Sequence, residues 1–304
     1  MRPALKSGLL PVWRDRDTLQ IGIDPRRAIA LSGMGQAAVL IGLLDGSRDR
    51  EQVLAVAARH GVPVPTSERI LTLLAAGGAI DDFPASTLRE LPAQARARLA
   101  AELATVSLAH GDGDGGARSL ARRRAALVWI DGDRRIGRAV TRILRASGVS
   151  KVRTAQPAAP IRPDLVILIG LQSPDRPAKL VAERVPHLAV SAGEAIGVVG
   201  PMVIPGQTAC MRCLDYVRSG NDPAWPLILA QLATRRPDPP ACDAVLAAAV
   251  AAQAAAQALT AIDKTPASCA AVNGTLELEL PGWQWRRRTW QPHPACPCAG
   301  HTTM

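Results

Sequence analysis

Residues 201–215 read PMVIPGQTACMRCLD and place Cys210 and Cys213 in a C-x-x-C spacing. Near the end of the chain, residues 296–298 read CPC and add Cys296 and Cys298. Two close pairs of thiolates separated by a long insertion are a typical ligand set for a tetrahedral zinc ion. We therefore expect these four cysteines to hold one zinc ion. Four thiolates leave no open coordination position, so the expected role is structural and not catalytic.

Two other uses of these cysteines are less consistent with the sequence. Disulfide bonds need an oxidising compartment, and residues 1–17 (MRPALKSGLLPVWRDRD) contain no apolar segment of signal-peptide length. We therefore expect a cytoplasmic protein. A redox C-x-x-C would leave the second cysteine pair unexplained.

Length and composition allow two ordinary globular domains and do not predict a membrane protein. The chain has 304 residues, of which 48% are hydrophobic. Its longest apolar run, residues 241–262, is mostly alanine, begins near Asp243 and places Gln253 and Gln257 on one helical face. This pattern predicts a packed helix of a soluble protein.

The net charge of +10 favours an acidic partner, which charge alone does not identify as nucleic acid, membrane surface or peptide. A high arginine content also follows from the base composition of some genomes.

The first eighty or so residues predict a small α+β module. Three short strands are expected over residues 9–14, 18–23 and 27–31, followed by helices over 34–44, 49–59 and 66–76. Three strands and three helices in this order and length predict a winged-helix module over residues 1–84.

The run from Leu9 through Leu44-Asp45-Gly46 to Ile80 resembles the PqqD-like recognition modules that bind leader peptides of ribosomally made natural products. The resemblance implies that a leader adds as a strand between the third strand and the third helix. Carried over, the peptide-binding residues lie in both segments: Ala28, Ile29, Ala30, Leu31, Ile70, Leu73 and Leu74. The alternative is that Ile70, Leu73 and Leu74 belong only to the core of the module.

A winged helix also raises the possibility of DNA binding. A DNA-reading helix needs Arg, Lys, Asn or Gln along its face. Residues 66–82 (TSERILTLLAAGGAIDD) offer Arg69 against Glu68, Asp81 and Asp82. We therefore expect no nucleic-acid partner.

A connector over residues 85–124 is expected to contain a helix over 91–108 and a break at HGDGDGG, residues 110–116. From residue 125 strands and helices alternate, with strands over 127–130, 151–154 and from Asp164, and a helix over 135–146. This alternation predicts a Rossmann-like α/β domain with a parallel sheet over residues 125–304.

The first loop of this domain is a damaged nucleotide-binding motif. Gly132 and Gly137 occupy the first and last positions of G-x-G-x-x-G, but Arg134 replaces the middle glycine. Asp131 and Asp133 add negative charge, and the second strand continues into AQPAAPIRP without an acid for a ribose. We therefore expect no ATP binding here.

Residues 125–304 resemble the ThiF-like adenylyltransferases, which are related to ubiquitin-activating enzymes. The resemblance implies a zinc site at Cys210, Cys213, Cys296 and Cys298 and frequent homodimers. The ATP-binding acids and catalytic Arg and Lys of that family have no counterparts in residues 155–163 or in LQSPDRPAKL, residues 171–180. Adenylation is therefore not expected.

Other chemically active side chains give weaker signals. Cys242 lies at a predicted helix start, where the helix dipole lowers thiol pKa values, but no base is suggested beside it. His293 and His301 flank the CPC motif and are expected to be either outer groups of the metal site or solvated. A hairpin around Pro281-Gly282 carries Trp283, Trp285 and residues 286–288 (RRR), which predicts either an acidic-ligand site or a solvated domain edge.

Taken with both resemblances, the sequence predicts a leader peptide-binding partner protein of an azole-forming (TOMM) peptide modification system. In such systems a separate YcaO-type cyclodehydratase carries out the ATP-dependent chemistry. The resemblance implies that the protein binds the leader of the precursor, which is expected to be acidic, and presents the precursor to that enzyme, with no catalysis of its own. The alternative is an active ThiF-like adenylyltransferase acting on a peptide or carrier-protein C-terminus, and a nucleic-acid-binding regulator is a third.

Overall fold

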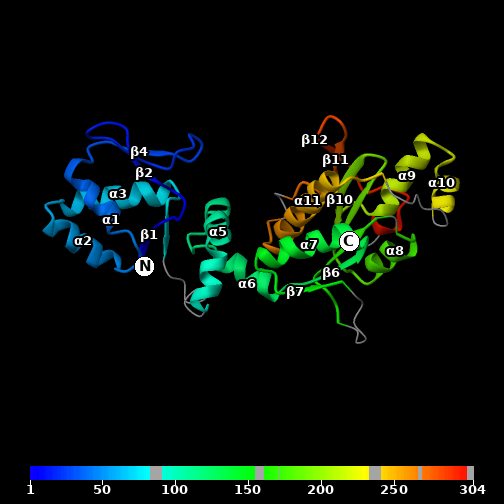
Figure 1. Ribbon diagram of the computed structural model, residues 1–304, viewed down its shortest axis with the longest axis horizontal. Helices are drawn as coiled ribbons and strands as arrows, with labels where there is room; N and C mark the ends of the chain where they lie inside the picture. Colours follow the sequence, from blue (N-terminus) through cyan, green and yellow to red (C-terminus); the bar gives the residue numbers. More distant parts are fainter. Residues whose placement is uncertain (83–90, 155–160, 171, 233–240, 266–268, 300–304) are drawn as a thin grey trace. The chain divides into compact units, whose positions relative to one another are not determined.

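The computed structural model describes residues 1–82, 91–154, 161–170, 172–232, 241–265 and 269–299. The chain forms two compact units, Met1–Ala121 and Arg122–Met304. Figure 1 labels their helices and strands.

The first unit contains two small antiparallel sheets and several helices. Strand β1 pairs with β5, and β2, β3 and β4 form a three-stranded sheet in that order. The elements are β1 (Pro3–Leu5), β2 (Pro11–Trp13), β3 (Leu19–Ile21), β4 (Ile29–Leu31), η1 (Gly35–Ala38), α1 (Val39–Gly42), α2 (Arg50–Arg59), α3 (Val64–Ala76), β5 (Ile80–Asp82), α5 (Ala93–His110) and α6 (Ala117–Ala125), which extends beyond the unit.

The three expected strands and the second and third helices are confirmed, with shorter strands than the sequence predicts. The helix expected over residues 34–44 is instead a 3-10 turn, η1, followed by the four-residue α1. Strands β1 and β5 were not predicted, because three residues are too few to show an alternating pattern.

Helix α2 begins where its sequence provides a cap. The Asp49 side chain accepts a hydrogen bond from the Gln52 backbone N–H at 2.8 Å, and the Gln52 side chain accepts one from the Asp49 N–H at 3.1 Å. This reciprocal capping box satisfies amides that lack partners in the helix. Val53 of α2 then packs with Leu40 and Leu74 in the core of the unit.

The second unit is built on a seven-stranded mixed sheet with the order β12-β11-β10-β9-β8-β6-β7. Its strands are β6 (Leu127–Gly132), β7 (Lys151–Arg153), β8 (Leu165–Ile169), β9 (His187–Gly193), β10 (Ile196–Val203), β11 (Gly274–Glu279) and β12 (Gln284–Thr289). The predicted parallel arrangement is confirmed for β6, β7, β8 and β9, while β10, β11 and β12 are antiparallel additions.

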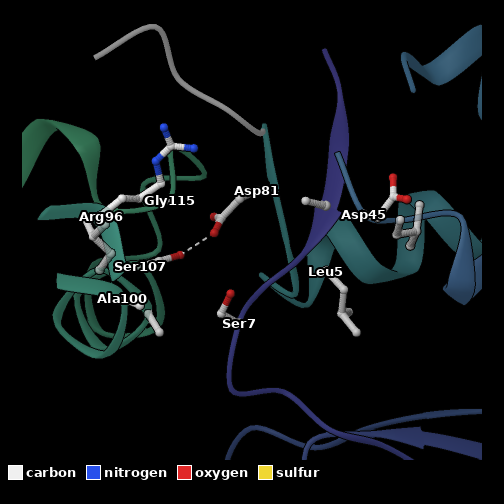
Figure 2. Close-up of a pocket in the computed structure, with 12 residues that line it drawn as sticks. Leu5, Ser7, Asp45, Asp81, Arg96, Ala100, Ser107 and Gly115 are labelled. Carbon is white, nitrogen blue, oxygen red and sulfur yellow. Dashed lines mark hydrogen bonds between the residues drawn. The ribbon is translucent and has the colours of Figure 1, made fainter. Parts of the chain in front are cut away.

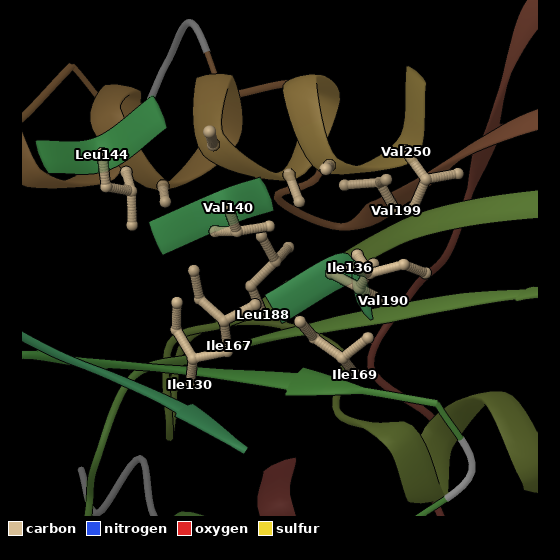
Figure 3. Close-up of a cluster of buried hydrophobic side chains, with 14 of the residues drawn as sticks. Ile130, Ile136, Val140, Leu144, Ile167, Ile169, Leu188, Val190, Val199 and Val250 are labelled. Carbon is tan, nitrogen blue, oxygen red and sulfur yellow. The ribbon is translucent and has the colours of Figure 1, made fainter. Parts of the chain in front are cut away.

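Two helices, α7 (Arg134–Ala146) and α11 (Ala244–Ile262), cover one face of this sheet. Figure 3 shows Val140 of α7 and Val250 of α11 among the side chains of the central strands. On the opposite face, Leu180 of α8 (Asp175–Ala182) packs with Val166 and Leu168 of β8. All five residues of β8 are buried, and the strand thus contributes side chains to both layers.

Helix α11 is long and apolar enough to cross a membrane by length and composition alone. Val250, Ala251, Ala254, Ala255 and Ala258 are buried in the core shared with α7 and the sheet. The helix is therefore accounted for as a core element, as its sequence predicts.

Candidate functional site

The four cysteines expected to bind zinc come together in the second unit. Their Sγ atoms all lie within 4.8 Å of one another. Individual Sγ–Sγ distances are 3.8 Å for Cys210–Cys213, 3.6 Å for Cys210–Cys296 and 3.2 Å for Cys213–Cys298. A tetrahedron with Zn–S bonds of ~2.3 Å has edges of ~3.8 Å, so the quartet is close to the required size.

The chain positions the first pair through the start of helix α9 (Met211–Asn221). Cys210 is its N-cap residue and Cys213 lies in its first turn, which brings both sulfurs to the same end of the helix. The preceding loop is held by two side chains. Thr208 Oγ1 accepts from the Ile204 N–H at 2.8 Å, and Asn273 Oδ1 accepts from the Ala209 N–H at 2.9 Å.

The second pair is positioned by the segment that follows β12. Trp290 is buried, and its Nε1–H donates to Thr275 Oγ1 at 3.0 Å. The His293 backbone N–H donates to Cys213 Sγ at 3.3 Å, and the His293 carbonyl accepts from the Cys296 N–H at 2.8 Å. The His293 ring stacks on Tyr216 at a centroid distance of 4.9 Å. His293 thus supports the four cysteines through backbone hydrogen bonds and is not one of the four ligand residues. His301 lies outside the described residues.

The thiols are buried in a way that favours a bound cation. Burial raises the pKa of Cys210 to about 11 and also raises the pKa of Cys298, where the Cys213 side chain adds to the effect. Burial acts in the same direction on Cys213, but the His293 and Cys210 backbone donors lower the pKa of Cys213 overall. Several buried thiolates repel one another, and a divalent ion removes that repulsion. The donor set therefore fits zinc.

The loop between β6 and α7 carries Gly132, Arg134 and Gly137, the expected remnants of a nucleotide motif. Gly132 has a positive φ of 111°, and a Cβ there would collide with the Ile169 carbonyl oxygen. Gly137 faces Ile130, whose Cγ2 would lie 3.2 Å from an added Cβ, so helix and strand pack closely. Local packing therefore requires glycine at position 132 and favours a small residue at position 137.

The N-terminus of α7 is already occupied by a carboxylate of the chain itself. Asp133 Oδ1 accepts hydrogen bonds from the backbone N–H groups of Arg135 at 2.7 Å and Ile136 at 2.9 Å. Phosphates bind at such helix ends through the same amides. Asp directly before a helix is a recognised cap signal, so the sequence could have predicted this cap as well as the charge of Asp133.

Two of the arginines near this loop, Arg176 and Arg135, are engaged in hydrogen bonds. Arg176 Nε donates to Asp131 Oδ2 at 2.9 Å, and Arg135 Nη2 donates to the carbonyl oxygens of Cys242 and Asp243. Burial raises the pKa of Cys242, so this thiol is not activated as a nucleophile. Residues 155–160 and residue 171, which belong to the two segments without counterparts of the ATP-binding acids, lie outside the described residues.

The expected peptide-binding residues divide into exposed and buried positions. Ile70 and Leu74 have 3% and 0% exposure and belong to the core of the first unit. Leu73, on the same helix, is 49% exposed. On β4, Leu31 is buried, Ile29 and Ala28 are partly buried, and Ala30 is exposed. Leu73 and Ala30 are thus the members of this set most open to a ligand.

Strand β4 is the edge of its sheet, and hydrogen-bond alternation determines which backbone groups face outward. The Arg14 N–H donates to the Thr18 carbonyl, and the Gly22 N–H donates to the Leu10 carbonyl. Even-numbered residues of β3 therefore point to β2, and Leu19 and Ile21 point to β4, opposite Leu31 and Ile29. Consequently the N–H and C=O groups of Ala30 point away from β3, toward the open edge.

The basic hairpin consists of β11 and β12, and β12 is an edge strand of the seven-stranded sheet. All six residues of β12 are exposed. Arg287 is nevertheless used structurally, because its guanidinium donates to the carbonyl oxygens of Ala270 at 2.8 Å and Val272 at 3.1 Å. Arg288 lies over the Trp290 ring at 4.4 Å.

No protein-family model matches the sequence, and no curated protein is similar to it in sequence. Its fold is similar to that of several solved structures. A structure of E. coli MccB with AMPCPP and MccA superposes with a TM-score of 0.71 at 14% identity, over 99% of this chain and 100% of that one.

A heterocyclase in complex with substrate and cofactor gives a TM-score of 0.73 at 17% identity, covering 98% of this chain and 39% of that chain. The heterocyclase TruD gives 0.70 at 17% identity, covering 98% and 42%. The chain therefore spans less than half of those heterocyclases. At these identities the likeness establishes a shared fold.

Proposed function

We propose that this protein binds the leader of a ribosomally synthesised precursor peptide and presents the peptide to a separate YcaO-type cyclodehydratase. The first unit would act as a PqqD-like, winged-helix recognition module. The second would be a ThiF-like domain, stabilised by structural zinc and without catalytic activity. We further propose that the protein is a cytoplasmic homodimer.

The observation that carries this proposal is the open edge of β4. The outward N–H and C=O groups of Ala30 can pair with an extended peptide, and Leu73 on α3 is an exposed apolar side chain of the same unit. The similar folds of MccB, solved with MccA, and of a heterocyclase, solved with its substrate, support a role in peptide modification.

The non-catalytic assignment is supported by the β6–α7 loop. Asp133 occupies the helix amides that a phosphate would need, and Asp131 and Arg176 are paired with each other. A triphosphate would have to displace a carboxylate and would meet its negative charge. We expect calorimetry with ATP and magnesium to show no binding.

One observation favours a second candidate, an ATP-dependent adenylyltransferase. MccB, which shares the fold over its full length, has been solved with AMPCPP and with ATP. Micromolar ATP binding together with peptide-dependent pyrophosphate exchange would support this candidate and overturn the non-catalytic one.

The leader-binding proposal is tested with Ala30→Pro in the full chain. Proline removes the outward N–H without removing a hydrogen bond to β3. The probe is a labelled leader taken from a short precursor-like reading frame beside the gene, followed by fluorescence anisotropy. We expect binding to weaken at least about fivefold, since one hydrogen bond contributes roughly 1 kcal/mol.

Ala30→Val is the matched control, because it keeps the N–H and suits a strand. Circular dichroism checks that both variants are folded. A folded Ala30→Pro protein that binds the leader as tightly as the parent would remove the peptide from this edge. A protein that binds duplex DNA but no leader would favour a regulator.

A further inference from the structure

The first unit contains a cavity of about 400 Å³ between the strands β1 and β5 and the helix α5. It is separate from the residues assigned to leader binding, none of which lines it. Figure 2 shows Arg96, Ala100 and Ser107 of α5 on one side and Leu5 and Asp45 on the other. The volume lies within the range of roughly 300–1,000 Å³ typical of ligand pockets.

The two sides of the cavity are held together by a buried polar network. Ser107 Oγ donates to Asp81 Oδ2 at 2.6 Å, and Lys6 Nζ donates to the Ser107 carbonyl at 2.6 Å. Lys6 and Asp81 are 3% and 6% exposed, and Lys6 Nζ lies 3.4 Å from Asp81 Oδ1. Buried charges are costly unless paired, so this network fixes α5 against the strands and preforms the cavity.

Apolar groups make up much of the cavity wall. The apolar lining residues come from β1, α5 and the segment after α1, and they are Ala4, Leu5, Leu44, Ala100, Leu103 and Ala104. An aliphatic or aromatic group entering the cavity would therefore exchange water for apolar contacts.

Arg96 is the cation in the described wall of this cavity, and the two wall carboxylates, Asp45 and Asp81, lie in ion pairs with Arg48 and Lys6. Asp45 already accepts from Ser47 and lies 3.4 Å from Arg48, and Asp81 is engaged as described. Arg96 is exposed and donates to the Leu91 carbonyl at 3.3 Å, but has no carboxylate partner among the described residues. Its guanidinium suits a carboxylate.

We infer that this cavity is a second binding site for the precursor peptide, taking an apolar side chain into the cavity and a neighbouring Asp or Glu side chain at Arg96. The inference rests on the proposed leader-binding function and adds a contact away from the β4 edge. Charge complementarity with Arg96, which has no carboxylate partner in the part of the chain that the structure describes, selects an acidic peptide. Two contacts made by one peptide strengthen each other through effective concentration.

The first experiment asks whether the cavity binds such chemistry. The probe is anilinonaphthalene sulfonate, an aromatic body with an anionic group, added to the full chain and followed by fluorescence. Ala100→Trp should abolish the cavity signal by filling it, and Arg96→Gln should weaken binding by about two- to fivefold, as for an exposed ion pair. Ala101→Trp and Arg98→Gln on the same helix are the matched controls, because neither residue lines the cavity.

The second experiment identifies the occupant by displacing the probe. A short capped peptide of Glu and Leu should displace it better than the same peptide with Gln for Glu. Decanoate tests the other source of this chemistry, a free fatty acid. Displacement by decanoate but not by the peptide would overturn the inference, as would a probe signal unaffected by Ala100→Trp.

The labelled leader separates this inference from the proposed function. If the inference holds, both Ala100→Trp and Ala30→Pro weaken leader binding. A leader that responds to Ala30→Pro alone would refute the cavity site and leave the proposed function standing. A leader that does not bind the parent protein would refute both.

Discussion

Replacing Cys213 with serine tests the metal site most directly. Cys213 has 0% exposure and its Sγ lies within 4.8 Å of the other three sulfurs. Because the position is sealed from solvent, water cannot easily replace the missing thiolate. A structural zinc site contributes roughly 12 kcal/mol of apparent binding free energy, or about 3 kcal/mol for each of four ligands. We therefore expect zinc affinity to fall about 100-fold or more.

The assay is competition with a chromophoric zinc chelator, together with metal analysis and thermal unfolding of the purified protein. The parent should hold one zinc per chain and Cys213→Ser should lose it, with a lower melting temperature. Cys242→Ser is the control, since Cys242 lies outside the quartet. Burial raises the pKa of Cys210 to about 11, so zinc uptake at neutral pH should also release protons.

Retention of one tightly bound zinc by folded Cys213→Ser would refute the four-thiolate site. Loss of zinc from Cys242→Ser would equally show that the quartet is misassigned.

Three further predictions concern stability. Asp133→Ala should lower the free energy of unfolding by about 1 kcal/mol through loss of the α7 cap, whereas Asp133→Ser should keep most of the parent's stability because serine is also a capping residue. Equal urea midpoints for the Ala and Ser variants would contradict the cap. Asp263→Asn should lower the free energy of unfolding by about 3–5 kcal/mol, because it weakens a buried, bidentate pair with Arg123 in which Nη2 and Oδ2 are 2.7 Å apart. A change under 1 kcal/mol in urea unfolding would count against this role of the pair. Burial lowers the pKa of His187 in the folded protein, so the unfolded chain binds a proton more readily than the folded one. The free energy of unfolding should therefore be constant above about pH 6.5 and should fall as the pH drops from there toward the folded-state pKa. His187→Gln should flatten that fall, and a parent protein equally stable at pH 7.5 and 5.5 would exclude the mechanism.

Local sequence patterns predicted much of the secondary structure because the spacing of apolar residues along a strand or helix reflects which side chains must be buried. The alternation over residues 18–23 and the apolar run of β8 predicted strands, since each shows which faces must be buried. The C-x-x-C and C-x-C spacings predicted a four-cysteine cluster because each pair can reach one edge of a tetrahedron. The helix expected over residues 34–44 was partly wrong, since apolar spacing does not distinguish a 3-10 turn from an α-helix over so few residues.

The pairing of distant residues required the tertiary structure. Ile70, Leu73 and Leu74 were expected to bind the peptide together, yet packing buries Ile70 and Leu74 and leaves Leu73 exposed. The elements packed against a helix decide which of its residues are buried. The outward direction of Ala30 follows from the register of three strands and has no signal in its own sequence. Likewise Lys6, Asp81 and Ser107 come from distant parts of the chain, and their network forms only when β1, β5 and α5 pack together. Sequence thus determined the elements and the candidate ligands, whereas long-range packing decided which of their groups face a partner.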